Sequence, residues 1–111
     1  MALSPIAGTH SDWGHVMHTV VRHYQGAAAL MDELGKRSAD VEELIRGIPG
    51  FVAYYLVKTA DGGYSVSVFE DSAGTDESNR RAATYLKENL SSLAISPPEI
   101  LSGESIIDFA R

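Results

Sequence analysis

The chain has no cysteine among its 111 residues. Disulfide bonds, thiolate nucleophiles and cysteine-ligated zinc or iron–sulfur sites are therefore excluded. Basic residues are also few, since 9 Lys and Arg stand against 15 Asp and Glu, for a formal net charge of −6. Because non-specific binding to nucleic acids or anionic membranes needs clustered basic side chains, we expect no nucleic-acid partner and no membrane partner.

Long apolar runs are missing as well. No stretch approaches the roughly 18 apolar residues that span a bilayer. The first residues, MALSPIAGTHSDWGHV, lack the basic and apolar regions of a signal peptide. A cytoplasmic location is the expectation. Residues 1–14 show no hydrophobic periodicity and are predicted to be a flexible arm, followed by one domain over residues 15–111.

The sequence does contain a regular succession of periodic segments. Residues 15–24 are β-branched and aromatic, which predicts a strand. Residues 27–48 carry apolar side chains three, four and seven apart, which predicts one amphipathic helix, with a break near residues 35–38 as the alternative. The remaining predicted elements are strands at 51–59 and 64–70, a helix capped by Thr75 and ending before Pro97, and a strand at 99–109 with a bulge or bend at Gly103.

The order β-α-β-β-α-β predicts a ferredoxin-like α+β fold. Its natural packing is a four-stranded antiparallel sheet with two helices on one face. A sheet of this kind leaves its other face without helices. If that face is apolar, a monomer would expose a contiguous apolar surface to water.

The segment PGFVAYYLVKTADGGYSVSVFED, residues 49–71, predicts a hairpin with a two-residue turn within residues 61–63. Because a strand follows the glycines, a turn is favoured over a phosphate-binding loop. Tyr54 and Tyr55 then point to opposite faces, and we assign the side of Tyr55 to the helices. We expect a second copy of the chain to cover the other face, although a three-residue loop would exchange the two sets. The predicted dimer-face residues are Val52, Tyr54, Leu56 and Phe69.

The candidate ligand-pocket residues are His18, His23 and Tyr55. A histidine titrates near neutral pH and could act as a general base, and a tyrosine could donate to a developing oxyanion. The simpler readings are partly buried strand histidines satisfied by neighbours, and a core tyrosine whose hydroxyl reaches water. No metal site is predicted, because the histidines at 10, 15, 18 and 23 do not converge in an extended strand.

The element order and the segments IRGIPGF and YYLVKTADGGYSVSVFED resemble the dimeric α+β barrel proteins, above all the antibiotic biosynthesis monooxygenase-like superfamily, over about residues 16–109. The resemblance implies a homodimer with a cavity between sheet and helices. Members include cofactor-independent oxygenases acting on aromatic polyketides or quinols, and haem-degrading enzymes. The Asn, Trp and His or Tyr set of those oxygenases is not matched, since the only Trp is Trp13, and Asn79 and Asn89 lie on the second predicted helix.

Three functions follow from the resemblance, and no cofactor is predicted for any of them. The first is a cofactor-independent monooxygenase acting on a small aromatic or quinone-type molecule. The second is a non-catalytic dimeric module that binds a small hydrophobic ligand. The third is a stress-related dimer without a pocket of consequence. A cavity of roughly 300 Å³ or more with convergent polar groups would favour the enzyme.

Overall fold

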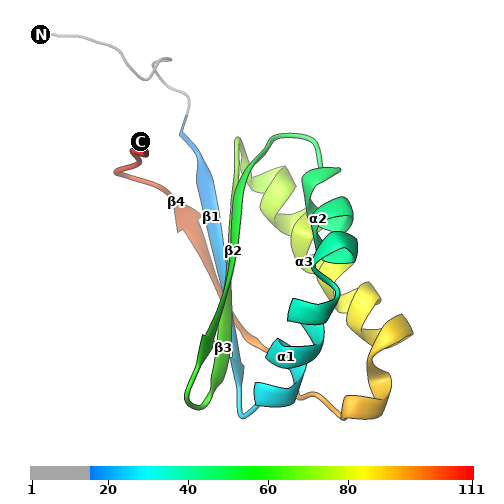
Figure 1. Cartoon of the computed structure of the whole chain (residues 1–111). Coiled ribbons are helices and arrows are strands. Elements are labelled where there is room, and N and C mark those ends of the chain that lie inside the picture. Colours follow the sequence, from blue (N-terminus) through cyan, green and yellow to red (C-terminus); the bar gives the residue numbers. More distant parts are fainter. Residues whose placement is uncertain (1–15) are drawn as a thin grey trace, which may run out of the picture.

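The computed structural model describes residues 16–111, so the predicted arm at 1–14 lies outside the described residues. Four antiparallel strands form one sheet in the order β2-β3-β1-β4, and the helices lie together on one face (Figure 1). This confirms the predicted ferredoxin-like α+β fold. The elements are β1 (His18–Gln25), α1 (Ala28–Lys36), α2 (Ser38–Arg46), β2 (Phe51–Thr59), β3 (Gly62–Phe69), α3 (Ser72–Asn89), a 3-10 turn η2 (Ser91–Leu93) and β4 (Glu99–Glu104).

The helix predicted over residues 27–48 is in fact two helices. α1 and α2 are separated at Arg37, whose φ of −108° and ψ of 31° are not helical. The break falls within the alternative range 35–38, next to Gly35, a poor helix former. The two helices contribute buried residues to different clusters, since Leu34 of α1 joins Tyr24 and Leu30, whereas Ile45 of α2 joins Phe69. With the chain divided into two short helices, buried side chains of this segment pack into both clusters.

The β2–β3 hairpin turns one or two residues earlier than predicted. Thr59 pairs with Gly62, so the two-residue loop consists of residues 60–61. Gly62 and Gly63 instead lie in β3, where Gly62 has a φ of +144°. A Cβ atom on Gly63 would collide with the Met31 side chain of α1. The glycines therefore allow close packing between β3 and its neighbours, a role that local turn chemistry did not indicate.

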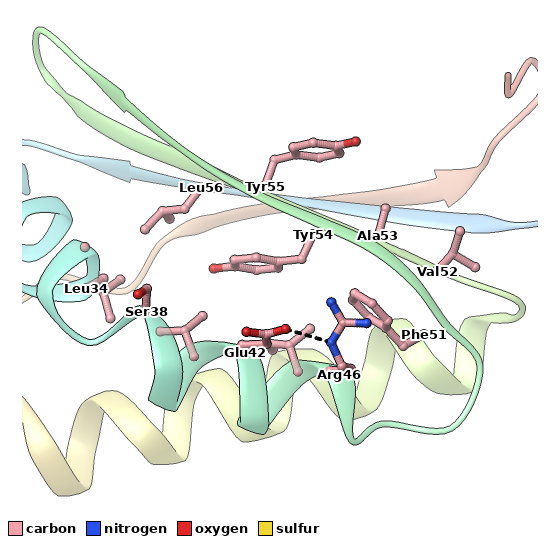
Figure 2. A pocket seen from close by; sticks show the side chains of 13 residues that line it. Leu34, Ser38, Glu42, Arg46, Phe51, Val52, Ala53, Tyr54, Tyr55 and Leu56 are labelled. Atoms are coloured by element: carbon pink, nitrogen blue, oxygen red, sulfur yellow. Dashed lines mark hydrogen bonds and ion pairs between the residues drawn. The ribbon is translucent and has the colours of Figure 1, made fainter. Parts of the chain in front are cut away.

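From residue 53 onward the two side-chain sets of the hairpin are as predicted, but the faces are reversed. Tyr55 pairs with Val66, as a two-residue loop requires. However, Tyr55 is 61% exposed on the face opposite the helices, and Tyr54 points toward α2 (Figure 2). Leu56 packs against the core under the helices. The assignment of the Tyr55 side to the helices is therefore wrong.

The other predicted dimer-face residues follow the same correction. Phe69 is fully buried against Ile45 and Ile48 on the helix side. A register irregularity between Phe51 and Ala53 leaves Val52 as the extra residue of a β-bulge, 42% exposed. The bulge also turns Phe51 toward the helices, which a regular alternation would not do.

Smaller differences from the predicted elements occur at the start of α3 and in β4. α3 begins at Ser72 with Asp71 as its cap, because the Asp71 side chain accepts a hydrogen bond from the Gly74 backbone N–H at 3.2 Å. The observed cap lies four residues before the predicted Thr75 cap. β4 ends at Glu104 instead of residue 109, and Gly103 pairs in regular register without a bulge. Within the described residues, no helix combines the length and apolar character needed to cross a bilayer.

Candidate functional site

A groove of about 530 Å³ lies between the edge strand β2 and the helices α1 and α2 (Figure 2). Each of these three elements contributes apolar side chains to its walls, including Leu34 of α1, Ile45 of α2 and Leu56 of β2. Two charged residues of α2 also line it. Glu42 accepts a hydrogen bond from Arg46 at 3.0 Å. The volume is within the range of about 300 to 1,000 Å³ typical of small-molecule sites.

Tyr54 projects from β2 into this groove, above the helix α2 (Figure 2). Burial raises the pKa of its hydroxyl to about 12, although the nearby positive charge of Arg22 opposes the shift. The hydroxyl is therefore protonated at neutral pH. A protonated phenol in an apolar groove can donate a hydrogen bond to an oxygen atom of a ligand.

Arg22 of β1 lies deeper in the molecule and is only 2% exposed. Its Nε donates to Ser65 Oγ at 3.0 Å, and its Nη2 donates to Ser67 Oγ at 3.2 Å. Its Nη1 donates to Asn79 Oδ1 at 2.7 Å and to Ser78 Oγ at 3.3 Å. The guanidinium thus connects β1 and β3 to the start of α3. We refer to Arg22 with these four partners as the Arg22 cluster.

A small inner cavity of about 30 Å³ separates the Arg22 cluster from the groove. Arg22, Tyr24 and Tyr85 line its inner side. The cavity shares one wall with the groove. The side chains common to both spaces are Leu34, Val41, Ile45, Tyr54 and Leu56.

The predicted pocket residue His23 does not enter the groove. Its ring stacks on Tyr64 with a centroid distance of 4.2 Å and an interplanar angle of 6°. Asp61 and Glu99 each place a carboxylate oxygen 3.9 Å from one of its ring nitrogens. In residues 16–111, no three potential metal-ligating side chains gather at one point.

The other two predicted pocket residues, His18 and Tyr55, lie in other parts of the sheet. His18 begins β1 and pairs with Phe69 and Glu104, at the far end of the strand from His23. Tyr55 contributes to the boundary of the groove, but its ring lies on the opposite side of β2 from Tyr54 (Figure 2). The structure therefore does not bring the three predicted residues together.

The Arg22 cluster was missed by the sequence interpretation. Arg22 interrupts the apolar run HTVVRHY, and Ser65 and Ser67 alternate with valines in YSVSVF. A polar residue every second position usually marks a solvated strand face. Arg22 lies within the apolar residues of another predicted strand, and it was the signal that the two serines could instead be buried hydrogen-bond partners.

No protein-family model matches the sequence, and no curated protein matches it. Several solved structures do match. Protein NE2512 of Nitrosomonas europaea, of unknown function, is 19% identical with a TM-score of 0.64, and the match covers 87% of this chain and 95% of that one.

Two further matches have described activities. A monooxygenase from ActVA-Orf6 of Streptomyces coelicolor, solved with nanaomycin D, is 24% identical with a TM-score of 0.57, over 87% of this chain and 93% of that one. The heme-degrading protein Rv3592 of Mycobacterium tuberculosis is 17% identical with a TM-score of 0.57, over 88% and 100%. At such identities the matches are informative about the fold alone, and this chain has the ferredoxin-like fold of the antibiotic biosynthesis monooxygenase-like proteins that its sequence resembles.

Proposed function

We propose that the protein is a homodimeric, cofactor-independent monooxygenase that acts on a small aromatic or quinone-type molecule bound in the groove. The observation that carries this proposal is the groove itself, with the protonated Tyr54 hydroxyl and the Glu42 carboxylate on its walls. Its volume accommodates a two- or three-ring aromatic molecule. Proteins of the same fold include SnoaB, a cofactor-independent oxygenase of Streptomyces nogalater, at 22% identity and a TM-score of 0.53.

The proposed chemistry needs a base and a stabiliser of negative charge. A ring CH₂ group that is conjugated with a ketone through aromatic rings loses a proton to the base, and the negative charge passes to the ketone oxygen as an enolate. The enolate reduces O₂, and the balanced outcome is conversion of CH₂ and O₂ into C=O and H₂O. In the proposed reaction Glu42 accepts the proton and the Tyr54 hydroxyl donates to the enolate oxygen, because both side chains line the groove.

The homodimer is proposed because the open face of the sheet is apolar. Tyr55, Val57 and Leu101 on this face are 61%, 47% and 63% exposed. Three large apolar side chains on one sheet face favour burial against a second copy. Sedimentation should give the mass of a dimer at micromolar concentration, and a strict monomer would contradict this part of the proposal.

The experiment that tests the activity uses anthrone, which has one CH₂ group beside aromatic rings. We expect the protein to accelerate O₂ uptake and anthraquinone formation in a ratio of one to one, in the presence of EDTA, above the rate without protein. Tyr54→Phe and Glu42→Gln should each slow turnover by about 10- to 100-fold. The matched control Glu88→Gln, on the exposed surface of α3, should leave the rate unchanged.

A non-catalytic binding module is the second candidate. The observation that favours it is the hydrogen bond that Arg46 donates to the Glu42 carboxylate at 3.0 Å, which occupies one of the two oxygens that would accept a substrate proton. Anthrone binding in calorimetry without O₂ uptake would select this second function. Absence of both binding and turnover would contradict an aromatic ligand in the groove.

A further inference from the structure

Arg22 is a buried positive charge whose hydrogen-bond partners are all neutral. Its side chain donates four hydrogen bonds, to three serines and one asparagine. The Tyr24 hydroxyl also interacts with the guanidinium, and it too is a neutral partner. No carboxylate within the described part of the chain lies within 4.0 Å of it, although every other arginine from 37 to 81 pairs with a glutamate.

The tyrosines around Arg22 do not neutralise it. Burial raises the pKa of the Tyr24 hydroxyl, and burial likewise raises that of Tyr54 to about 12. Both phenols are therefore uncharged at neutral pH. A buried ion without a counter-charge is costly, and proteins usually pair such ions or use them to bind a ligand.

The inner cavity places an empty volume beside this charge. Its volume of about 30 Å³ is close to the space that one water molecule takes in the liquid, which is enough for a single oxygen atom of a ligand. Only the shared wall that includes Tyr54 and Leu56 stands between this cavity and the groove. A ligand that reaches from the groove into this cavity has to displace side chains of this wall.

We propose that Arg22 is an anion-binding group, and that the ligand is an aromatic molecule whose ionised oxygen, as a phenolate or carboxylate, enters the inner cavity while its rings occupy the groove. This inference rests on the proposed function, because the rings must bind in the groove. It specifies the substrate class further, since a neutral aromatic molecule would leave the Arg22 charge unmatched. It also gives Arg22 a role in stabilising an enolate or phenolate.

The competing explanation is that Arg22 only fastens α3 to the sheet through Ser78 and Asn79. A structural role predicts that the charge of a ligand has no effect on its affinity. A second competitor is Arg46, which also lines the groove, but its charge is matched by Glu42. The test therefore has to separate ligand charge from ring binding, and Arg22 from Arg46.

The experiment measures binding of 2-naphthoate, an anion, and 2-naphthamide, its neutral analogue, to the full chain by calorimetry at pH 7.5. We expect the wild type to bind 2-naphthoate at least about tenfold more tightly, as for a contact to a buried charged group. Arg22→Gln should remove this preference and leave 2-naphthamide affinity within about twofold. Arg22→Lys keeps the charge and should retain part of the preference, and Arg46→Gln should retain all of it.

Each outcome decides between the two proposals. If neither probe binds the wild type, the aromatic groove of the proposed function is wrong, and this inference is wrong with it. If both bind with equal affinity, the groove stands and the role of Arg22 is overturned. Loss of the preference in Arg46→Gln but not in Arg22→Gln would also overturn it. Circular dichroism checks folding, and if Arg22→Gln does not fold, the wild type and Arg22→Lys still decide.

Discussion

Replacement of Ser67 by alanine tests the hydrogen bonding of the Arg22 cluster most directly. Ser67 is fully buried, and its hydroxyl accepts from Arg22 Nη2 at 3.2 Å. In Ser67→Ala, the guanidinium loses the partner that Ser67 provides for Nη2. The charge stays in place, so the variant removes one hydrogen bond without relieving the burial of the ion.

The expected magnitude follows from the charged donor. A hydrogen bond to an ionised group contributes about 1.5–3 kcal/mol to the free energy of unfolding, roughly twice the value for a neutral pair. For a domain of about 100 residues, 1 kcal/mol corresponds to a shift in Tm of about 4–8 °C. We therefore expect Ser67→Ala to lower Tm by at least about 6 °C.

The assay is thermal and urea unfolding followed by circular dichroism at fixed protein concentration. The matched control is Ser102→Ala on the exposed strand β4, which should change stability by less than about 0.5 kcal/mol. A double-mutant cycle with Arg22→Met completes the design, because Ser67→Ala should cost little once the guanidinium is gone. Equal effects of Ser67→Ala and Ser102→Ala, or an unchanged cost in the Arg22→Met background, would refute the reasoning.

Three further predictions concern other parts of the molecule. Tyr55→Asp should convert the proposed dimer to monomer in sedimentation, because it places a charge on the apolar open face; an unchanged mass would argue against contact through Tyr55. Gly74→Ala should lower the free energy of unfolding, measured in urea, by about 1–2 kcal/mol, because the new Cβ atom would lie 2.6 Å from the Cβ atom of the buried Phe69. A more stable variant would show that the higher helix propensity of alanine outweighs this clash. Between pH 10 and 12 the unfolded chain releases the Tyr54 proton while the folded protein keeps it, so the free energy of unfolding should fall by about 1.4 kcal/mol per pH unit. Tyr54→Phe should flatten this slope. An identical slope in the variant would contradict the burial of the hydroxyl.

Local pattern was sufficient to predict the elements and their order. The β-branched and aromatic residues of FVAYYLVKT and the alternation in YSVSVF define two strands, and the odd and even side chains of each necessarily lie on opposite faces. Whether the hairpin loop has an even or an odd number of residues then determines which residues of the two strands share a face. For this reason the pairing of Tyr55 with the Val66 side was predictable even though the turn position was not.

The side of the sheet that meets the helices was decided only by tertiary structure. Both faces of β2 are apolar, so hydrophobicity does not distinguish Tyr54 from Tyr55. The serines at 65 and 67 are polar, and they become buried because Arg22 on another strand supplies their hydrogen bonds. A polar residue is stable in a core only when a distant partner satisfies it, and no local pattern contains that information.

The sequence by itself therefore determined the order β-α-β-β-α-β and the two side-chain sets of the hairpin from residue 53 onward, because both depend on periodicities of a few residues. The bulge at Val52 and the separation of α1 from α2 were not determined by these periodicities. The position of the Arg22 cluster depends on hydrogen bonds from β1 to β3 and α3, which join residues 43 to 57 positions apart in the chain. Only the folded structure brings these residues together, and with them the candidate site.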